Sequence, residues 1–418
     1  MNRRLLRRNL GIAAAFAALA TCSSSAAPQK APAQKPRIRA VTAFVNLDRA
    51  QYERQIADAF ALLKRARTTF ESRGYEVQTI RLATQPFPEY IKGLSPAEAI
   101  AFFLKLDAIA DRDKFIIAIG PAMQNANDSA AQADLLASIL RGTKHISGTV
   151  VVAGDDGIRW PAVGAAARVI KKLEDTDRSE GNFRFAAVAM VPPMSPFFPA
   201  AYNEGFGHQF AIGLESPNLI QAAFKGAPDL AAARRKLTDA LAGEAFDVQT
   251  HANRIDMETG WRFAGIDLSP APGKDASIAL AMEALTQQPF GASGTLTAAA
   301  TITAGIKAVA AKQTGYSGLM LPVLEDPEIA KRWSEGHLSV DALLAYSAVC
   351  ATGLDTIPLP GDITEEQLDL MIGDVASLAF KWHKPLAARL LPVAGKQAGD
   401  MTEFADPNLI NVKLQPLD

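Results

Sequence analysis

The sequence predicts an α/β protein built around buried, mostly parallel strands. Apolar and β-branched runs alternate with amphipathic segments of helical periodicity from residue 38 onward. The first 120 residues read strand, helix, strand, helix, strand, an order that requires crossover helices between parallel strands. No linker or change in composition follows residue 38, so we expect one large domain over 38–418.

Nine segments are expected to form strands because they are rich in Val, Ile, Phe and Thr and are bounded by turn residues. Pro86 stops the second, and the Gly120-Pro121 pair ends the third. In chain order the expected strands are 38–47, 75–84, 114–122, 146–154, 183–191, 209–216, 261–272, 318–326 and 385–393.

Seven longer segments have the spacing of apolar residues that predicts helices. Ser95, with Glu98 three residues later, forms a capping-box pattern before one of them. Gly74 and Gly260 are typical glycines at helix C-termini. The expected helices are 49–72, 95–111, 160–176, 231–260, 297–315, 339–353 and 364–382.

The N-terminus has the layout of a secretory signal peptide, which we place at 1–26. An arginine-rich start precedes a short apolar stretch, Leu10–Ala20, that is too short for a membrane span. Residues 27–37 read as a spacer of Pro, Ala, Gln and Lys. We expect export to the periplasm or cell envelope. Lipidation at Cys22 and the twin-arginine route through Arg7-Arg8 stay open as alternatives.

The composition excludes several classes of protein. A net charge of −1 argues against nucleic-acid binding, which needs a basic face. The five histidines lie far apart, so a zinc protease or zinc ribbon is not expected. No Walker loop, dinucleotide fingerprint or nucleophile elbow occurs. The sequence thus identifies no metal and no cofactor, and the expected partner is a small-molecule ligand, with a homo-oligomer left open.

Polar loops at strand ends are the candidate functional residues, because ligands in α/β proteins bind there. Asp267 and Ser269 follow one strand, and Glu325 with Asp326 follows another; either pair could bind a ligand or simply cap a helix. Gly294 and Thr295 precede a small-residue helix whose N-terminus would favour an anion.

The stretch 345–362 contains Cys350, one of two cysteines in the chain, together with Asp355, Thr356 and Asp362. Nearby acids raise the pKa of a thiol, so this composition argues against an activated nucleophile. A lone cysteine is also often a small core residue. Basic groups that could hold an anionic ligand are Arg81, Lys384, Arg389 and Lys396.

Seven stretches in order carry a resemblance to a known family. They are GYEVQTIRLATQPF, PFFPAAY, IDLSPAP, GTLTAA, GLMLPVLED, VCATGLDTIPLPGD and KPLAARLLPVAGKQAGDMTEF. Together they resemble the domain-of-unknown-function 711 family, also catalogued as uncharacterised protein family 0210, from about residue 38 to 407. Ala351 departs from the family pattern, which has Gly after the cysteine. The expected export also departs from a family that is usually cytoplasmic.

The resemblance implies a large ten-stranded β/α barrel of the pyruvate formate-lyase-like type, built from two five-stranded halves. In such enzymes a cysteine on a loop inside the barrel forms a thiyl radical. This sequence has no C-terminal Arg-Val-x-Gly-Tyr motif, so no glycyl radical is expected. The resemblance also implies that the strand-end loops face one cavity.

Three functional hypotheses follow. The first is an exported enzyme for a small anionic metabolite, with Cys350 and Asp355 as the reactive pair and Asp267 and Glu325 orienting the substrate or a cation. The second is an envelope protein that binds a small ligand with the same loops but without catalysis. The third is a structural or partner-binding protein.

Overall fold

The computed structural model describes residues 35–271, 273 and 276–417. The predicted signal peptide, Cys22 and most of the predicted spacer lie outside them, so export and lipidation stay predictions. The last spacer residues already belong to the fold, because Lys35 pairs with Asp247 and Arg37 begins the first strand. Among the described residues, none of the helices is both long enough and apolar enough to span a bilayer.

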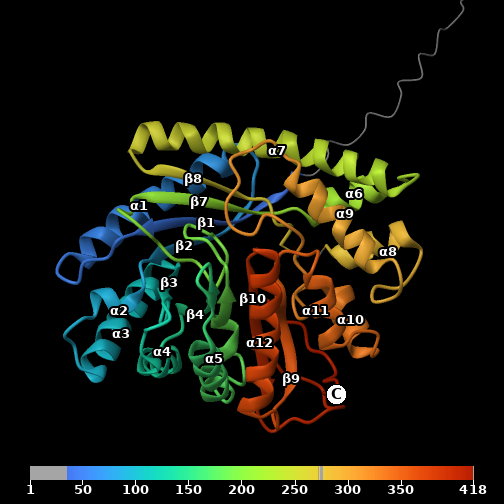
Figure 1. Cartoon of the computed structure of the whole chain (residues 1–418). Helices are drawn as coiled ribbons and strands as arrows, with labels where there is room; N and C mark the ends of the chain where they lie inside the picture. The colour runs from blue at the N-terminus through green and yellow to red at the C-terminus, as the bar shows by residue number, and fades with distance from the viewer. Residues whose placement is uncertain (1–34, 272, 274–275, 418) are drawn as a thin grey trace, which may run out of the picture. The chain divides into compact units, whose positions relative to one another are not determined.

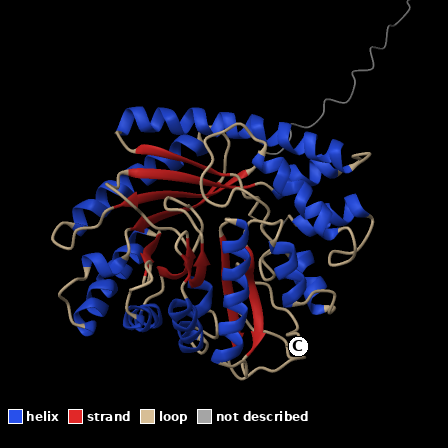
Figure 2. Cartoon of the chain, in the orientation of Figure 1, coloured by secondary structure: helices blue, strands red, loops and turns tan. Residues whose placement is uncertain are grey.

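The strands lie inside the molecule and the helices surround them (Figures 1 and 2). The strands are β1 (Arg37–Val45), β2 (Val77–Thr84), β3 (Ile116–Pro121), β4 (Ile146–Gly154), β5 (Gly157–Ile158), β6 (Phe185–Ala189), β7 (Gln209–Glu215), β8 (Arg262–Asp267), β9 (Gly353–Pro360) and β10 (Leu386–Val393).

The long helix α7 runs alongside β8, and α12 lies beside β10 (Figure 1). The helices are α1 (Tyr52–Glu71), α2 (Phe87–Tyr90), α3 (Pro96–Asp113), α4 (Ala130–Gly142), α5 (Trp160–Leu173), α6 (Pro217–Phe224), α7 (Leu230–Thr259), α8 (Ile278–Thr286), α9 (Thr295–Lys307), α10 (Pro327–Ser334), α11 (Val340–Ser347) and α12 (Glu365–Trp382), with the 3₁₀ turn η1 (Gly181–Arg184). The predicted capping box of Ser95 and Glu98 begins α3.

All ten strands form one mixed sheet in the order β8-β7-β1-β2-β3-β4-β6-β10-β9, with β5 paired to β4. Five neighbours, β1, β2, β3, β4 and β6, are parallel, as the alternating sequence predicts. The sheet reverses direction twice, because β7 is antiparallel to β1 and β10 is antiparallel to β6. The α/β class and the ten-stranded sheet are therefore confirmed.

Both faces of the sheet are buried, and residue size differs between them. Along β6, Phe185 and Ala187 face the main core, which the helices cover, while Ala186 and Val188 belong to a second cluster. The same alternation places Ala83 of β2 in a third cluster. We call the face that carries the second and third clusters the inner face. Small residues there leave room for the β6–β7 connection, whose Ala200 and Ala201 pack against it.

The expected strand at 318–326 is wrong. Pro322 has no N–H to give to a ladder, and residues 323–325 form a turn. The segment instead makes separate bonds to β9: Val323 N–H donates to the carbonyl of Asp355 at 3.1 Å. Earlier in the chain, Thr314 N–H donates to the carbonyl of Ile266 in β8 at 3.0 Å. Thus 312–324 runs between the two terminal strands of the pairing order without being a strand.

The expected strands also omit the stretch after Cys350, which is wrong, since β9 begins at Gly353 and every residue of the strand is buried. Pro358 and Pro360 made the stretch look unlike a strand. They fit because β9 is last in the pairing order, where one side needs no ladder donors.

A substitution at Gly353 tests how closely β9 approaches β10. Its φ is 90°, and a Cβ there would lie 2.3 Å from the carbonyl oxygen of Ala387. We expect Gly353→Ala to lower the free energy of unfolding in urea by more than about 3 kcal/mol, because backbone atoms must move. Gly395→Ala is the matched control, with φ of 72° and no atom within 4 Å of the new Cβ. Gly395→Ala should lower the free energy of unfolding by about 1 kcal/mol. Equal losses of unfolding free energy in both variants would contradict the close approach of β9 to β10.

Candidate functional site

A cavity opens on the inner face of the sheet, where charged side chains meet aromatic ones. Its empty space, including the open mouth, is about 550 Å³. The charged lining residues are Arg39, Arg81, Asp267, Glu325, Asp355 and Arg389. The apolar ones include Phe183, Phe197, Phe198, Leu214, Met320 and Pro322.

Arg389 of β10 is the centre of a buried ion network. Its Nε donates to Asp355 Oδ1 at 2.7 Å, and its Nη2 donates to Glu325 Oε1 at 2.6 Å. Glu325 Oε2 accepts in turn from Arg39 Nη2 at 3.0 Å. Burial alone would lower the pKa of Arg389, but Asp355 and then Glu325 outweigh it and hold that pKa above its usual value. The network connects β1, β9 and β10 to Glu325, which directly follows segment 312–324.

Two β-bulges bring these side chains to the inner face. Between β9 and β10, the register passes from Leu354↔Ala388 to Ile357↔Leu390, so two residues of β9 oppose Arg389. Leu354 and Ile357 can therefore both face the main core while Asp355 faces the cavity. Bulges are frequent next to functional sites because they redirect a side chain.

A second bulge redirects Arg39. The β1–β7 register shifts between Ile38 and Ala40, which leaves Arg39 as the extra residue. Its Nη1 donates to Glu215 at 3.2 Å, and its Nη2 reaches Glu325.

The backbone of Thr356 is strained beside Asp355. Its φ is 47°, a left-handed conformation that β-branched residues rarely adopt. The residue is fully buried, and its Oγ1 accepts a hydrogen bond from Leu324 N–H at 3.2 Å. Strain of this kind persists where surrounding structure fixes it, and it clusters at functional sites.

Arg81 of β2 is the cation of the cavity that no carboxylate binds. Its only hydrogen bond among the described residues runs from Nη1 to the carbonyl of Pro196 at 3.3 Å, and its Nε is buried without a partner. The ring of Phe198 lies 5.4 Å from the guanidinium carbon. Burial, and then the charge of Arg39, lower the pKa of Arg81 to about 9, so it is still charged at neutral pH.

Burial raises the pKa of the Asp355 carboxyl to about 6, although Arg389 opposes this shift and Glu325 adds to it.

Asp267 has a structural role in addition to lining the cavity. Its Oδ1 accepts from the N–H groups of Ser269 and Ser317, and its Oδ2 accepts from that of Tyr316, at 2.9 to 3.0 Å. Asp267 therefore lines the cavity and also fixes residues 316–317 of segment 312–324.

Other polar atoms near the cavity are also unpartnered within the described chain. Tyr316 packs against Phe197, which lines the cavity, with ring centroids 4.7 Å apart, and its hydroxyl is buried. Ser195 precedes the lining residue Pro196. The unpartnered buried atoms of this region are Tyr316 Oη, Ser195 Oγ, Arg81 Nε and Thr42 Oγ1.

Six of the thirteen residues predicted from sequence meet in this cavity: Arg81, Asp267, Ser269, Glu325, Asp355 and Arg389. Thr356 supports them from β9 without lining the space. The two acids after 318–324 separate, because Glu325 faces the cavity whereas Asp326 caps α8 and α10 through Ile278 and Ile329.

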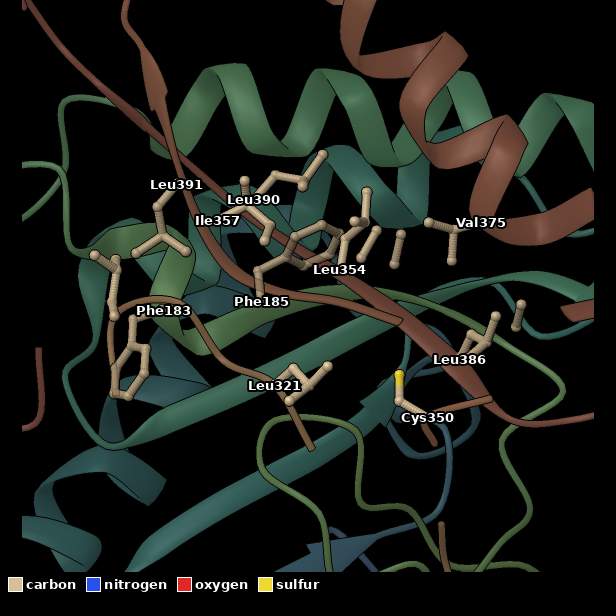
Figure 3. Packing of buried hydrophobic residues seen from close by; sticks show 14 of the residues in the cluster. Phe183, Phe185, Leu321, Cys350, Leu354, Ile357, Val375, Leu386, Leu390 and Leu391 are labelled. Atoms are coloured by element: carbon tan, nitrogen blue, oxygen red, sulfur yellow. The ribbon is translucent and has the colours of Figure 1, made fainter. Parts of the chain in front are cut away.

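The other six lie elsewhere. Cys350 packs in the main core at 1% exposure, in the cluster that also holds Leu354 and Leu386 (Figure 3). Lys384 donates to the carbonyls of Ser347 and Ala348 and so caps the end of α11. The remaining four are at surface turns and a helix start: Asp362, Lys396 with its partner Glu403, and Gly294 with Thr295 before α9.

Sequence reasoning missed Arg39 and the three phenylalanines. Arg39 carried a usable signal, because it is a charge inside an otherwise apolar strand. Phe197 and Phe198 lie in the stretch PFFPAAY that carried the family resemblance, but only the fold returns the β6–β7 connection to the inner face. Phe183, in η1 before β6, had no signal of this kind.

A family model described as "Uncharacterised ACR (DUF711)" matches residues 31–408. The chain belongs to the DUF711 family. A UPF0210 protein of Pyrobaculum islandicum is 33% identical over 398 residues, 88% of this chain and 87% of that one. Another from Pyrobaculum arsenaticum is 34% identical over 79% of this chain and 77% of that one. The predicted resemblance is thus confirmed.

Among solved structures, this DUF711 chain is similar to the anaerobic ribonucleotide reductase from Thermotoga maritima in complex with dATP and CTP. The TM-score is 0.40 at 8% identity, over 90% of this chain and 79% of that chain. Within the part of the chain that the structure describes, no three His, Cys, Asp or Glu side chains gather as metal ligands would.

The raised pKa of Asp355 predicts a pH dependence of stability. The folded state keeps the proton at pH values where the unfolded chain has released it, so stability falls as pH rises from about 3.8 to about 6. We expect the free energy of unfolding of the wild type, relative to Asp355→Asn, to fall by up to about 3 kcal/mol across this window. Urea denaturation at several pH values measures it, with the exposed Asp362→Asn as control. A difference that is constant with pH would contradict the prediction.

The burial of Cys350 predicts that its thiol is unreactive in the folded protein. In a Cys22→Ala background, a disulfide reagent should label Cys350 only as fast as the protein unfolds, because the side chain is 1% exposed. The labelling rate should therefore rise with urea in parallel with unfolding measured by circular dichroism. Rapid labelling of folded protein would instead restore Cys350 as a candidate reactive group.

Proposed function

We propose that the cavity binds a small organic anion through Arg81, and that the protein is an enzyme in which Asp355 transfers a proton to or from that anion. The observation that carries this proposal is the buried guanidinium of Arg81, which lines a cavity and has no carboxylate partner. A buried cation is costly unless an anion or several hydrogen bonds compensate it.

Arg184 illustrates what the protein does with a purely structural arginine. It is as buried as Arg81, but it pairs with Asp177 at 3.0 Å and donates to the carbonyls of Leu140 and Ile146. Arg81 has one long bond instead. The difference supports a missing partner from outside the chain, and a carboxylate or phosphate oxygen pair matches the planar fork of an arginine.

Asp355 has the properties of a general acid or base. Its raised pKa of about 6 keeps both protonation states accessible near neutral pH. Arg389 orients it, and the strained Thr356 fixes its backbone. Cys350, predicted from sequence as its reactive partner, packs away from the cavity, so the proposed chemistry uses no thiol.

The second candidate is a protein that binds the anion without catalysis. The ion pair itself favours it, because Asp355 Oδ1 is bonded to Arg389 at 2.7 Å and Glu325 is held from two sides. A carboxylate locked in this way transfers a proton only through its other oxygen.

We further propose that the sheet and segment 312–324 together form a pyruvate formate-lyase-like barrel of two halves. The bonds of this segment to both β8 and β9 support closure. Five parallel strands would form one half, and β7 to β10 with the segment would form the other. Export of the protein stays a proposal from the sequence of residues 1–26, and the cavity chemistry does not depend on it.

Arg81→Met tests the binding step. At least one of sodium cinnamate, acetate and phosphate at millimolar concentration should raise the melting temperature of the wild type in a zwitterionic buffer, and the variant should lose that rise. Without any anion it should be more stable than the wild type, because an unpaired buried charge is replaced by an apolar side chain. Arg184→Met is the control and should only destabilise. No anion-dependent shift in the wild type would contradict the proposal.

Asp355→Asn separates the two candidates. In heavy water with a cellular metabolite extract, the wild-type enzyme should consume or deuterate an anion that it retains, as measured by mass spectrometry. The variant should retain the same anion without converting it. Retention without conversion by both proteins would favour the binding protein.

A further inference from the structure

The charges around Arg81 indicate how many negative charges its ligand carries. Three guanidinium groups line the cavity, and two of them, on Arg39 and Arg389, share the carboxylates of Glu325 and Asp355. Arg39 also contacts Glu215, whose charge is balanced by Arg37 outside the cavity. The third carboxylate, Asp267, is compensated by three peptide N–H groups rather than by an arginine. One guanidinium is thus left for one negative charge.

A second negative charge on the ligand would be repelled. It would add to the fixed charges of Glu325 and Asp355. Glu325 is close enough to Arg81 to oppose part of the lowering of the pKa of Arg81. Repulsion between like charges is strong where water is excluded. A phosphate monoester or a dicarboxylate carries such a second charge at neutral pH, whereas a monocarboxylate does not.

The walls of the cavity indicate the shape of the rest of the ligand. Phe198 faces the guanidinium of Arg81 at 5.4 Å, and Phe183 and Phe197 lie 4.9 and 5.7 Å from that of Arg389. Aromatic rings stack well on flat groups. The apolar part of the lining also includes Leu214 and Met320. The cavity therefore offers Arg81, a cation without a carboxylate partner among the described residues, beside aromatic and apolar walls.

From this combination we infer that the ligand is a monocarboxylate with a flat, apolar body, such as an aryl or unsaturated acid. The carboxylate pairs with Arg81, and the body lies between the phenylalanines of η1 and the β6–β7 connection. This inference rests on the proposed anion site and specifies its substrate class.

Four probes in isothermal titration test the inference and separate it from the proposed function. Cinnamate has both the single charge and the flat body, cinnamyl alcohol lacks the charge, acetate lacks the body, and phenyl phosphate has the body with a second charge. We expect cinnamate to bind at least tenfold more tightly than each of the others. Arg81→Gln should weaken cinnamate at least tenfold.

Phe198→Leu gives a readout that a merely structural change would not move. It should weaken cinnamate several-fold while leaving acetate unchanged, and Phe60→Leu on α1, away from the cavity, should change neither. Equal or tighter binding of phenyl phosphate, or of acetate, would overturn the monocarboxylate class while leaving the anion site intact. Equal binding of cinnamyl alcohol, or no binding by any probe, would overturn the anion site itself.

Discussion

The buried ion network of Arg389 is the interaction on which the inner face of this protein depends. A charge removed from water is stable only with its partners in place, so Arg389, Asp355 and Glu325 must be positioned together or not at all. These residues come from β10, β9 and the end of segment 312–324. The network thereby fixes a part of the molecule where regular strand pairing is absent, since 312–324 makes only separate backbone bonds to its neighbours.

The two bulges follow from the same constraint. A strand buried on both faces alternates its residues strictly, and a charged residue would otherwise take the place of an apolar one in the main core. One extra residue in β9 lets Leu354 and Ile357 both reach that core while Asp355 meets Arg389. The left-handed backbone of Thr356 is the local cost of this arrangement. Stability and site geometry are therefore set by the same few residues.

Periodicity was sufficient to predict most of the sheet, because buried parallel strands joined by helices have distinct patterns. It failed where tertiary context decides. Pro358 and Pro360 are acceptable only because β9 is terminal in the pairing order, which no local pattern reveals. The apolar run at 318–326 reads as a strand, but Pro322 and the following turn prevent it.

The site was predictable to the extent that charges occur inside buried segments. Arg81, Asp355 and Arg389 are such charges, and so is Arg39, which the strand-end argument overlooked because it lies near the start of β1. Cys350 was misleading for the opposite reason. A rare residue type draws attention, yet Cys350 lies in the main core that also holds Leu354 and Leu386, and its burial follows from ordinary packing.

Arg81 differs from the two other arginines of the cavity, because it has no carboxylate partner among the described residues. Arg389 and Arg39 are satisfied within the chain, and removing either would leave a carboxylate unpaired. Removing Arg81 would leave nothing unpaired except the carbonyl of Pro196. Folding alone does not explain such a residue, and this is the reason for proposing an anionic ligand. The proposed ligand class rests on the same cation together with the aromatic walls beside it.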